Sequence, residues 1–243
     1  MARVDYDAQA GRYDRGRGIG DAAMAVWMAS ARRHFGDVGR ILDLGSGTGR
    51  FSAALADALD ADVLGVEPSA GMRGRAAAKP HPKVTVLAGG AEDIPLTDAS
   101  VDGVWLSNVI HHFDDFPKAA REIRRVLEAN GTVYLRGAIG GKPVPSLYRF
   151  FPATQAVIDT FPSMPQIVAT FQDAGFGSFY SELISYELAP NLSSMLERVR
   201  LRADTTLEKI SDEDFERGLA QMEEATNTET GPVVDHLDVV VMR

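Results

Sequence analysis

Residues 41–52 read ILDLGSGTGRFS, an apolar run that is interrupted by three glycines and then resumes. Gly45, Gly47 and Gly49 stand between an expected strand and an expected helix. Glycine permits a tight turn and lets a ligand approach the backbone, and the helix N-terminus behind it offers free N–H groups with partial positive charge. The stretch therefore predicts a ligand site, which fits a dinucleotide phosphate or some other ligand.

Composition limits the alternatives. The 243 residues fit one large domain, or a domain with a cap, and 45% of them are apolar and 24% charged, as in globular proteins. Acidic residues outnumber basic ones by 34 to 25, and a net charge of −9 disfavours a nucleic-acid substrate. The chain has no cysteine, which excludes disulfides, thiolate metal sites and a cysteine nucleophile. It shows neither a signal-like start nor a run of 18 apolar residues, so we expect a soluble cytoplasmic protein.

Strands and helices alternate up to residue 137. The expected strands are continuous apolar runs, which is typical of a parallel sheet covered on both faces. They span residues 40–44, 61–67, 83–89, 101–110 and 132–138. The expected helices span residues 21–35, 52–60, 69–79 and 116–131.

After residue 137 the pattern changes. Residues 138–162 are rich in proline and aromatic side chains, which predicts a cap whose Tyr148, Phe150, Phe151 and Phe161 form an apolar roof or simply the underside of a helix. A helix is expected over 163–176, with Ser163 as N-cap and Gln166 as its capping-box partner. Strands follow over 177–189 and 233–243. They are separated by a helical insertion, residues 190–230, that is too long for a hairpin loop and holds helices over 192–205 and 211–226.

Glu67 strengthens the ligand-site prediction. It ends the second expected strand about twenty residues after the glycines, where a carboxylate can accept hydrogen bonds from ribose hydroxyls. The alternative is a solvated acid at a strand end. A dinucleotide fingerprint needs its third glycine at position 50, which is occupied by Arg50. The combination favours a nucleoside ligand other than a dinucleotide.

Five motifs in order carry a family resemblance. The segments LDLGSGTG, GVEPSAGM, GGAEDIPL, VDGVWLSNVIHHFDD and EIRRVLEANGTVYL resemble the class I S-adenosylmethionine-dependent methyltransferases, in particular the small-molecule group that includes the ubiquinone/menaquinone C-methyltransferases. The resemblance covers roughly residues 5–137. It implies a single Rossmann-like α/β domain over 1–243, with a doubly wound, seven-stranded, mostly parallel sheet whose antiparallel last strand enters beside the fifth. Residues 1–35 would form an N-terminal helical cover, and 138–162 and 190–230 would be lid insertions.

The resemblance also implies a donor site for S-adenosyl-L-methionine. Its methionine part would lie over the glycine loop, near backbone groups of Gly45 and Gly47, with Asp43 just before the loop. Glu67 would hold the ribose, and Met72 would pack near the adenine. The implied cofactor-binding residues are Tyr6, Tyr13, Asp43, Gly45, Ser46, Gly47, Gly49, Glu67, Pro68, Met72, Ala91, Glu92, Asn108 and Val109. Tyr6 and Tyr13 would cover the cofactor, or would pack an amphipathic helix on the domain.

Three residues are candidates for catalysis. Methyl transfer depends mainly on in-line positioning, and it needs a base only when the nucleophile must lose a proton. His111 and His112 follow the fourth strand and could supply that base, or could only shape the loop. Arg136, at the end of the fifth strand, could hold an anionic group of the acceptor or pair with a lid acid. No metal is expected, because the chain lacks cysteine and two adjacent histidines on a strand point apart.

Several alternatives stay open. A nicotinamide-dependent oxidoreductase would share the sheet and the acid, and a non-methylating binder or a cyclase would share the fold and the cofactor. A nucleic-acid methyltransferase would need a basic face. Arg198 and Arg202, four residues apart in ERVRLR, favour a solvated helix face over a substrate clamp. The acceptor is expected to be a small molecule of unknown identity; the methylated atom and the oligomeric state are open, and a homodimer is one option.

Overall fold

A seven-stranded sheet organises the protein. The computed structural model describes residues 14–142 and 146–243. The strands are β1 (Arg40–Leu44), β2 (Asp62–Glu67), β3 (Val84–Ala88), β4 (Val101–Ser107), β5 (Leu127–Gly137), β6 (Phe179–Ala189) and β7 (Val233–Met242). Their order is β3-β2-β1-β4-β5-β7-β6, with β1 to β5 parallel and β7 antiparallel to β5. The predicted fold and the place of the last strand beside the fifth are confirmed.

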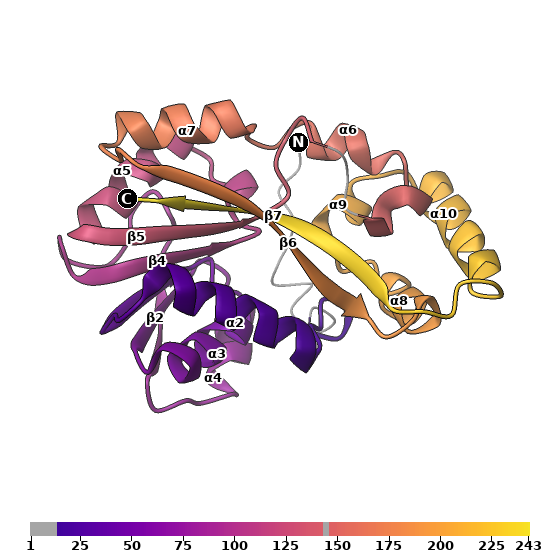
Figure 1. Cartoon of the computed structure of the whole chain (residues 1–243), viewed down its shortest axis with the longest axis horizontal. Helices are drawn as coiled ribbons and strands as arrows, with labels where there is room; N and C mark the ends of the chain where they lie inside the picture. The colour runs from indigo at the N-terminus through magenta and orange to yellow at the C-terminus, as the bar shows by residue number, and fades with distance from the viewer. Residues whose placement is uncertain (1–13, 143–145) are drawn as a thin grey trace. The chain divides into compact units, whose positions relative to one another are not determined.

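Helices cover both faces of the parallel strands. Figure 1 shows α2 (Asp21–Phe35), α3 (Arg50–Leu59) and α4 (Ala70–Ala77) on one face, and α5 (Phe116–Val126) and α7 (Met164–Asp173) on the other. The remaining helices are α6 (Thr154–Ile158), α8 (Leu192–Val199), α9 (Thr205–Glu208), α10 (Asp212–Ala225) and the short 3₁₀ helices η1 (Ile110–His112) and η2 (Ser146–Phe150). No helix among the described residues is long and apolar enough to cross a membrane.

The chain divides into two compact units. The sheet unit comprises Trp27–Gly137, Met164–Glu182 and Asp238–Arg243. The helical unit comprises, among the described residues, 14–26, Ala138–Ser163 and Leu183–Leu237. The helical unit contains the two predicted insertions and, of the predicted cover, residues 14–26, whereas residues 27–35 belong to the sheet unit. The role of these segments as a cover and a lid stays a prediction.

The core of the sheet unit explains the continuous apolar strands. Leu42, Val104, Trp105 and Tyr134 come from three adjacent strands and have no exposed surface. The rings of Trp105 and Tyr134 stack with centroids 4.6 Å apart and an interplanar angle of 8°. Since helices cover both faces, side chains on both sides of each strand are buried, and the polar–apolar alternation of a half-exposed strand is absent.

Two predicted boundaries in this unit are wrong. The fourth strand ends at Ser107 rather than at residue 110, because Asn108 adopts a left-handed conformation (φ 51°) that breaks the extended backbone. The helix expected over 116–131 ends at Val126, where the chain turns directly into β5. Leu127 pairs with Val101 in the sheet, and Arg124 donates to the carbonyl groups of Leu127 and Glu128. Sheet pairing therefore overrides the helical propensity of this segment.

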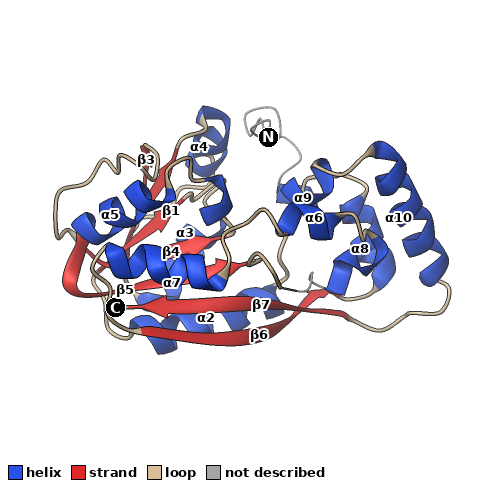
Figure 2. Ribbon diagram, turned by 90° about the horizontal axis from the view of Figure 1, so that it is seen from above, coloured by secondary structure: helices blue, strands red, loops and turns tan. Residues whose placement is uncertain are grey.

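The helical unit has a separate apolar core. Figure 2 shows α6, α8, α9 and α10 gathered in one group. Phe151, which is fully buried, stacks on Phe215 of α10 with ring centroids 5.8 Å apart. Gly218 permits this contact, because a Cβ there would lie 2.3 Å from the Phe151 ring. Tyr148 and Phe161 belong to the same buried cluster, so the aromatic residues of 138–162 serve as core. Helix α8 ends at Val199, and α9 was not predicted.

Candidate functional site

The glycine loop follows β1 and needs glycine at all three positions. Gly45, Gly47 and Gly49 have φ values of 73°, 57° and 73°, a region that residues with a Cβ rarely adopt. A Cβ on Gly45 would lie 2.4 Å from Val109 Cγ2, and a Cβ on Gly49 would lie 3.2 Å from Ala76 Cβ. Among the described residues, a Cβ on Gly47 would meet nothing within 4 Å. The first and third glycines therefore allow close packing, whereas Gly47 presents bare backbone to open space.

Glu67 is fixed beside this loop. Its side chain is only 6% exposed, so it is not the solvated strand-end acid of the alternative reading. Oε2 accepts a hydrogen bond of 3.0 Å from the backbone N–H of Gly47, and Oε1 accepts one of 2.8 Å from the N–H of Ser69. Arg73 donates to the backbone carbonyls of Glu67 and Pro68 and holds the turn after β2. The carboxylate thus has a defined position next to Gly47.

Asp43 is a second buried acid near the loop. It is 2% exposed and accepts a hydrogen bond of 2.6 Å from Ser52 Oγ on α3. Burial raises the pKa of the Asp43 carboxyl to about 7, and the negative charge of Glu67 raises it as well. The hydrogen bond from Ser52 and the positive charge of Arg50 act in the opposite direction and lower the pKa. Two acids at the ends of adjacent strands give this place a negative potential, which suits a cationic ligand.

Three other predicted residues shape the loop and the turn after β2. A Cβ on Gly65 of β2 would lie 2.9 Å from Ser46 Oγ, so the Ser46 hydroxyl lies behind the loop, against the strand. Met72 is 1% exposed, and its N–H donates to Ser69 Oγ at the start of α4. Pro68 is exposed. Ser46 and Met72 therefore support the loop and the following helix through packing.

Glu92 joins two loops. Its Oε1 accepts hydrogen bonds from the backbone N–H groups of Asp114 (2.8 Å) and Asp115 (3.3 Å), just before α5. Ala91, which precedes it, is buried at 6% exposure. The segment after β3 is thereby fixed against the segment after β4. The contact of Ala91 and Glu92 with adenine stays a prediction.

The segment after β4 lies against the glycine loop through Val109. Asn108, in its left-handed conformation, donates its N–H to the carbonyl of Arg136 over 2.9 Å. His111 and His112 lie in η1, not on a strand, and their ring centroids are 4.1 Å apart. The expectation that the two side chains point apart is therefore wrong. Within the described part of the chain, no group of three or more potential metal-binding side chains is found.

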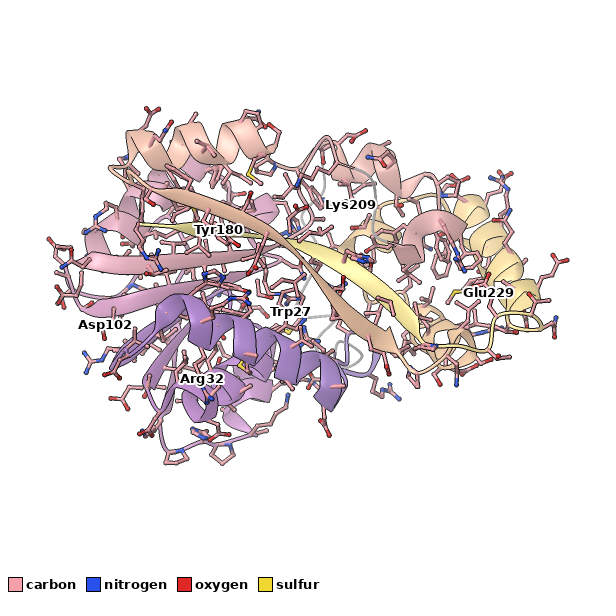
Figure 3. The ribbon with its side chains drawn as sticks, in the orientation of Figure 1. Trp27, Arg32, Asp102, Tyr180, Lys209 and Glu229 are labelled. Carbon is pink, nitrogen blue, oxygen red and sulfur yellow. The ribbon has the colours of Figure 1, made fainter. Side chains whose placement is uncertain are left out.

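Arg136 is almost completely buried at the end of β5. Its exposed fraction is 3%, and Nη1 donates to Ser107 Oγ over 2.8 Å. The guanidinium lies 3.9 Å from the ring centroid of Trp27, which Figure 3 labels on α2, and 4.9 Å from that of Phe51 on α3. Aromatic faces on two helices therefore hold this cation against the sheet.

Residues 42–135 match the model of the methyltransferase domain family. This range runs from β1 through β5 and includes the glycine loop, Glu67, Glu92 and the histidine pair. The chain therefore contains a methyltransferase domain over these residues, as the resemblance of the five motifs predicts.

Named relatives support the assignment over the same part of the chain. An uncharacterized methyltransferase of Mycobacterium tuberculosis is 34% identical over 134 residues, which are 54% of this chain and 51% of the relative. A ubiquinone/menaquinone biosynthesis C-methyltransferase of Rubrivivax gelatinosus is 43% identical over 91 residues, which are 37% and 36% of the two chains. The chain therefore spans about half the length, or less, of the curated relatives it matches.

Solved structures extend the similarity of fold to most of the chain. A methyltransferase candidate from an antibiotic biosynthesis pathway of Anabaena variabilis superposes with a TM-score of 0.71 at 23% identity, covering 93% of this chain and 98% of that one. A phosphoethanolamine N-methyltransferase of Haemonchus contortus, solved with S-adenosyl-L-methionine, gives a TM-score of 0.64 at 19% identity and covers 99% and 60%. At these identities the similarity concerns the fold alone.

The residues at the glycine loop fit S-adenosyl-L-methionine, the methyl donor that the resemblance implies. The open space over Gly47 leaves room for a ligand against the backbone, and Glu67 places a buried carboxylate beside it. The donor is a sulfonium cation with a ribose and no phosphate, which agrees with the acidic pair Asp43 and Glu67 and with the absence of a glycine at position 50.

Some site residues lie outside the prediction or outside the described residues. Tyr6 and Tyr13 fall in the segment 1–13, which the structure does not describe. Ser69 was missed as a partner of Glu67, although its place before a predicted helix marks it as an N-cap candidate. Ser52 and Trp27, which contact Asp43 and Arg136, carry no signal in the sequence, because those contacts form only in the folded protein.

Proposed function

We propose that this chain transfers a methyl group from S-adenosyl-L-methionine to a small-molecule acceptor. The observation that carries the proposal is the fixed position of Glu67, whose carboxylate accepts the N–H of Gly47 beside a loop that is open at that glycine. The match of residues 42–135 to the methyltransferase domain supports the same reading.

Each part of the site has a task in donor binding. Backbone groups of Gly45 and Gly47 face the methionine part of the donor, and Glu67 accepts hydrogen bonds from the vicinal ribose hydroxyls. Asp43 accepts a hydrogen bond from Ser52, and with a pKa of about 7 its carboxyl adds only part of a negative charge next to Glu67 at neutral pH. Met72, Ala91 and the backbone of the Glu92 turn border the adenine, with Asn108 and Val109 next to the methionine part.

The chemical step requires little from the protein. When bound, the donor supplies an electrophilic methyl group on a sulfonium that leaves as a neutral thioether. The protein holds the acceptor in line with that methyl group, which gives most of the rate enhancement. His111 or His112 accepts a proton where the acceptor nucleophile must lose one. Arg136 has a structural role at the end of β5, because its guanidinium donates to Ser107 and is enclosed by Trp27 and Phe51.

The acceptor class follows from charge and from the relatives. A net charge of −9 opposes binding to a phosphate backbone, which favours a small metabolite over a nucleic acid. Relatives with 33–35% identity include demethylmenaquinone methyltransferases, whose named acceptor is a quinone. We place the reaction in the cytoplasm.

A labelled-methyl assay tests the proposal. The purified chain is incubated with methyl-labelled donor and fractions of a small-metabolite library, with transfer RNA and DNA as parallel samples. We expect label in one or more small molecules and none in nucleic acid, and loss of transfer in Glu67→Ala. Donor binding without transfer to any fraction would identify a non-methylating binder and refute the proposed reaction.

A further inference from the structure

The 90–96 segment, which follows β3 in the sheet unit, leaves the sheet beside Glu67. The last residue of β3 is the register partner of Glu67 on β2. Pro95 folds back toward the start of the segment, because a Cβ on Gly89 would lie 2.6 Å from Pro95 Cδ and 3.2 Å from Val66 Cγ1. Val66 directly precedes Glu67. The 90–96 segment therefore packs next to the strand end that carries the Glu67 carboxylate.

Arg125, in the last turn of α5, binds this segment with its whole guanidinium. Nη1 donates to the backbone carbonyl of Leu96 over 2.8 Å, and Nη2 donates to that of Ile94 over 2.9 Å. Nε and Nη2 also donate to the two carboxylate oxygens of Glu122 over 2.8 and 2.7 Å, and Nη1 donates to Asp98 over 2.9 Å. All five N–H donors of the guanidinium therefore have an acceptor, and two of the acceptors are backbone carbonyls of one short segment.

Glu122 completes the attachment of the segment to α5. Its Oε2 accepts a further hydrogen bond of 3.0 Å from the backbone N–H of Ile94, which is 2% exposed. The hydrogen bond from Arg125 lowers the pKa of Glu122, so the carboxylate is charged at neutral pH. Both backbone polar groups of Ile94 are thus held by one bidentate arginine–carboxylate pair, whose geometry is well defined.

The opposite end of α5 holds the same segment through Glu92. Its Oε1 accepts from the N–H groups of Asp114 and Asp115, which directly precede the helix. One helix thus fixes the segment at residue 92 and again at residues 94 and 96. The side chains of Arg125 and Glu122 are 31% and 19% exposed, and ion pairs near the surface add little to stability. The arrangement therefore suits the placement of a backbone segment more than the stabilisation of the fold.

We propose that Arg125 and Glu122 are positioning residues that fix the 90–96 segment and thereby set the preference of the donor site for adenine. A site distinguishes two bases by hydrogen bonds to their edges, and it does so only where its own polar groups are held in place by supporting contacts. Neither residue touches the donor in this role, since both act through the backbone of the segment. The inference rests on the proposed function, because it concerns the donor site of that reaction.

Base selectivity in ligand binding tests this role. S-adenosylhomocysteine and S-inosylhomocysteine, which carries an oxo group in place of the adenine amino group, are titrated calorimetrically into each variant. We expect wild type to prefer the adenine ligand by about tenfold or more. In Arg125→Gln and in Glu122→Ala, affinity for the adenine ligand should fall about tenfold and the preference should shrink with it. Arg125→Lys should recover part of the preference, because an ammonium group reaches a carbonyl but lacks the fork of a guanidinium.

Arg124→Gln is the matched control. Arg124 lies beside Arg125 on α5 but donates to the carbonyls of Leu127 and Glu128, outside the 90–96 segment. Its loss should lower the free energy of unfolding in urea without a change in base preference, so the two measurements separate a positioning role from a structural one.

Two outcomes would overturn the inference while leaving the proposed function intact. One is that wild type binds the two ligands equally well, and the other is that Arg125→Gln keeps the base preference of the Arg124→Gln control. Glu122→Ala and Arg125→Lys are judged by the same criterion if Arg125→Gln does not fold. If S-adenosylhomocysteine does not bind the wild-type chain at all, the proposed function is refuted, and the inference with it.

Discussion

The backbone N–H of Gly47 donates a hydrogen bond of 3.0 Å to Oε2 of Glu67. This contact joins the turn after β1 to the end of β2, and the N–H of Ser69 holds the other carboxylate oxygen. Glu67 is therefore oriented before any ligand binds, and its side chain loses little conformational freedom on binding. The hydrogen bond thus connects the glycine loop with Glu67, which follows Gly47 by twenty residues.

Replacement of Glu67 should weaken donor binding. We expect Glu67→Gln to lower the affinity for S-adenosylhomocysteine about tenfold and Glu67→Ala by about tenfold to a hundredfold, since a hydrogen bond to a charged group contributes roughly 1.5–3 kcal/mol. Calorimetric titration measures both. Asp62→Asn, at the exposed opposite end of β2, is the control and should bind normally. Equal affinity in Glu67→Ala and in this control would remove Glu67 from the donor site.

Asp43 should make stability depend on pH. Its pKa of about 7 in the folded protein lies above the ordinary value of 3.8, so between these values the folded state holds more protons than the unfolded state. The contribution of Asp43 to the free energy of unfolding therefore falls as pH rises from about 4 to about 7. Asparagine cannot ionise but can still accept from Ser52. We expect the stability of Asp43→Asn relative to wild type to rise over this range by on the order of 2–4 kcal/mol.

Urea denaturation at a series of pH values measures this difference for Asp43. Asp57→Asn, an exposed aspartate of α3, serves as the control for a general loss of negative charge. If the free energies of unfolding of wild type and Asp43→Asn change in parallel between pH 4 and 7, the pKa of Asp43 is not raised in the folded protein and the prediction is wrong.

Alanine at Gly45 should destabilise the sheet unit. The added Cβ would lie 2.4 Å from Val109 Cγ2 at a φ of 73°, so we expect overpacking and backbone strain to cost about 2–4 kcal/mol together. In Gly47→Ala the added Cβ meets none of the described residues, so the substitution should cost only the backbone strain, about 1–2 kcal/mol. Urea denaturation measures both. Adding Val109→Ala to Gly45→Ala should restore part of the loss, and no restoration would mean that Val109 is not the obstacle.

Arg136 should contribute to stability through its aromatic neighbours. Arg136→Met removes the hydrogen bond to Ser107 and the contacts with Trp27 and Phe51, and we expect a loss of about 2–4 kcal/mol in thermal or urea unfolding. Arg121→Met, on the exposed surface of α5, is the control and should change stability by less than about 0.5 kcal/mol. If Arg136→Met and Arg121→Met lose the same amount of stability, Arg136 does not have the proposed structural role.

Most of the sheet could be predicted because its strands are short apolar runs bounded by turn residues. RILDL and the VLGVE segment were placed within one residue of β1 and β2. The end of β4 was misplaced because Asn108 takes a positive φ without being glycine, and the end of α5 because LEANG contains no breaker before Gly131. Pairing with Val101, which the local sequence does not encode, decides the second case.

The parts of the site that could be predicted are those whose positions follow from their spacing along the chain. The three glycines and Glu67 are separated by fixed intervals, so their juxtaposition follows from adjacent parallel strands. Ser52 and Trp27 could not be found in this way, because each meets its partner through packing between distant segments. The sequence also could not show that Arg136 would be enclosed by aromatic rings.

The identity of the ligand at the glycine loop is the central claim, and a direct titration tests it. Wild-type chain is titrated calorimetrically with S-adenosylhomocysteine and, separately, with NAD. We predict saturable binding of S-adenosylhomocysteine with one site per chain and no heat of binding with NAD. Saturable binding of NAD together with no binding of S-adenosylhomocysteine would contradict the account.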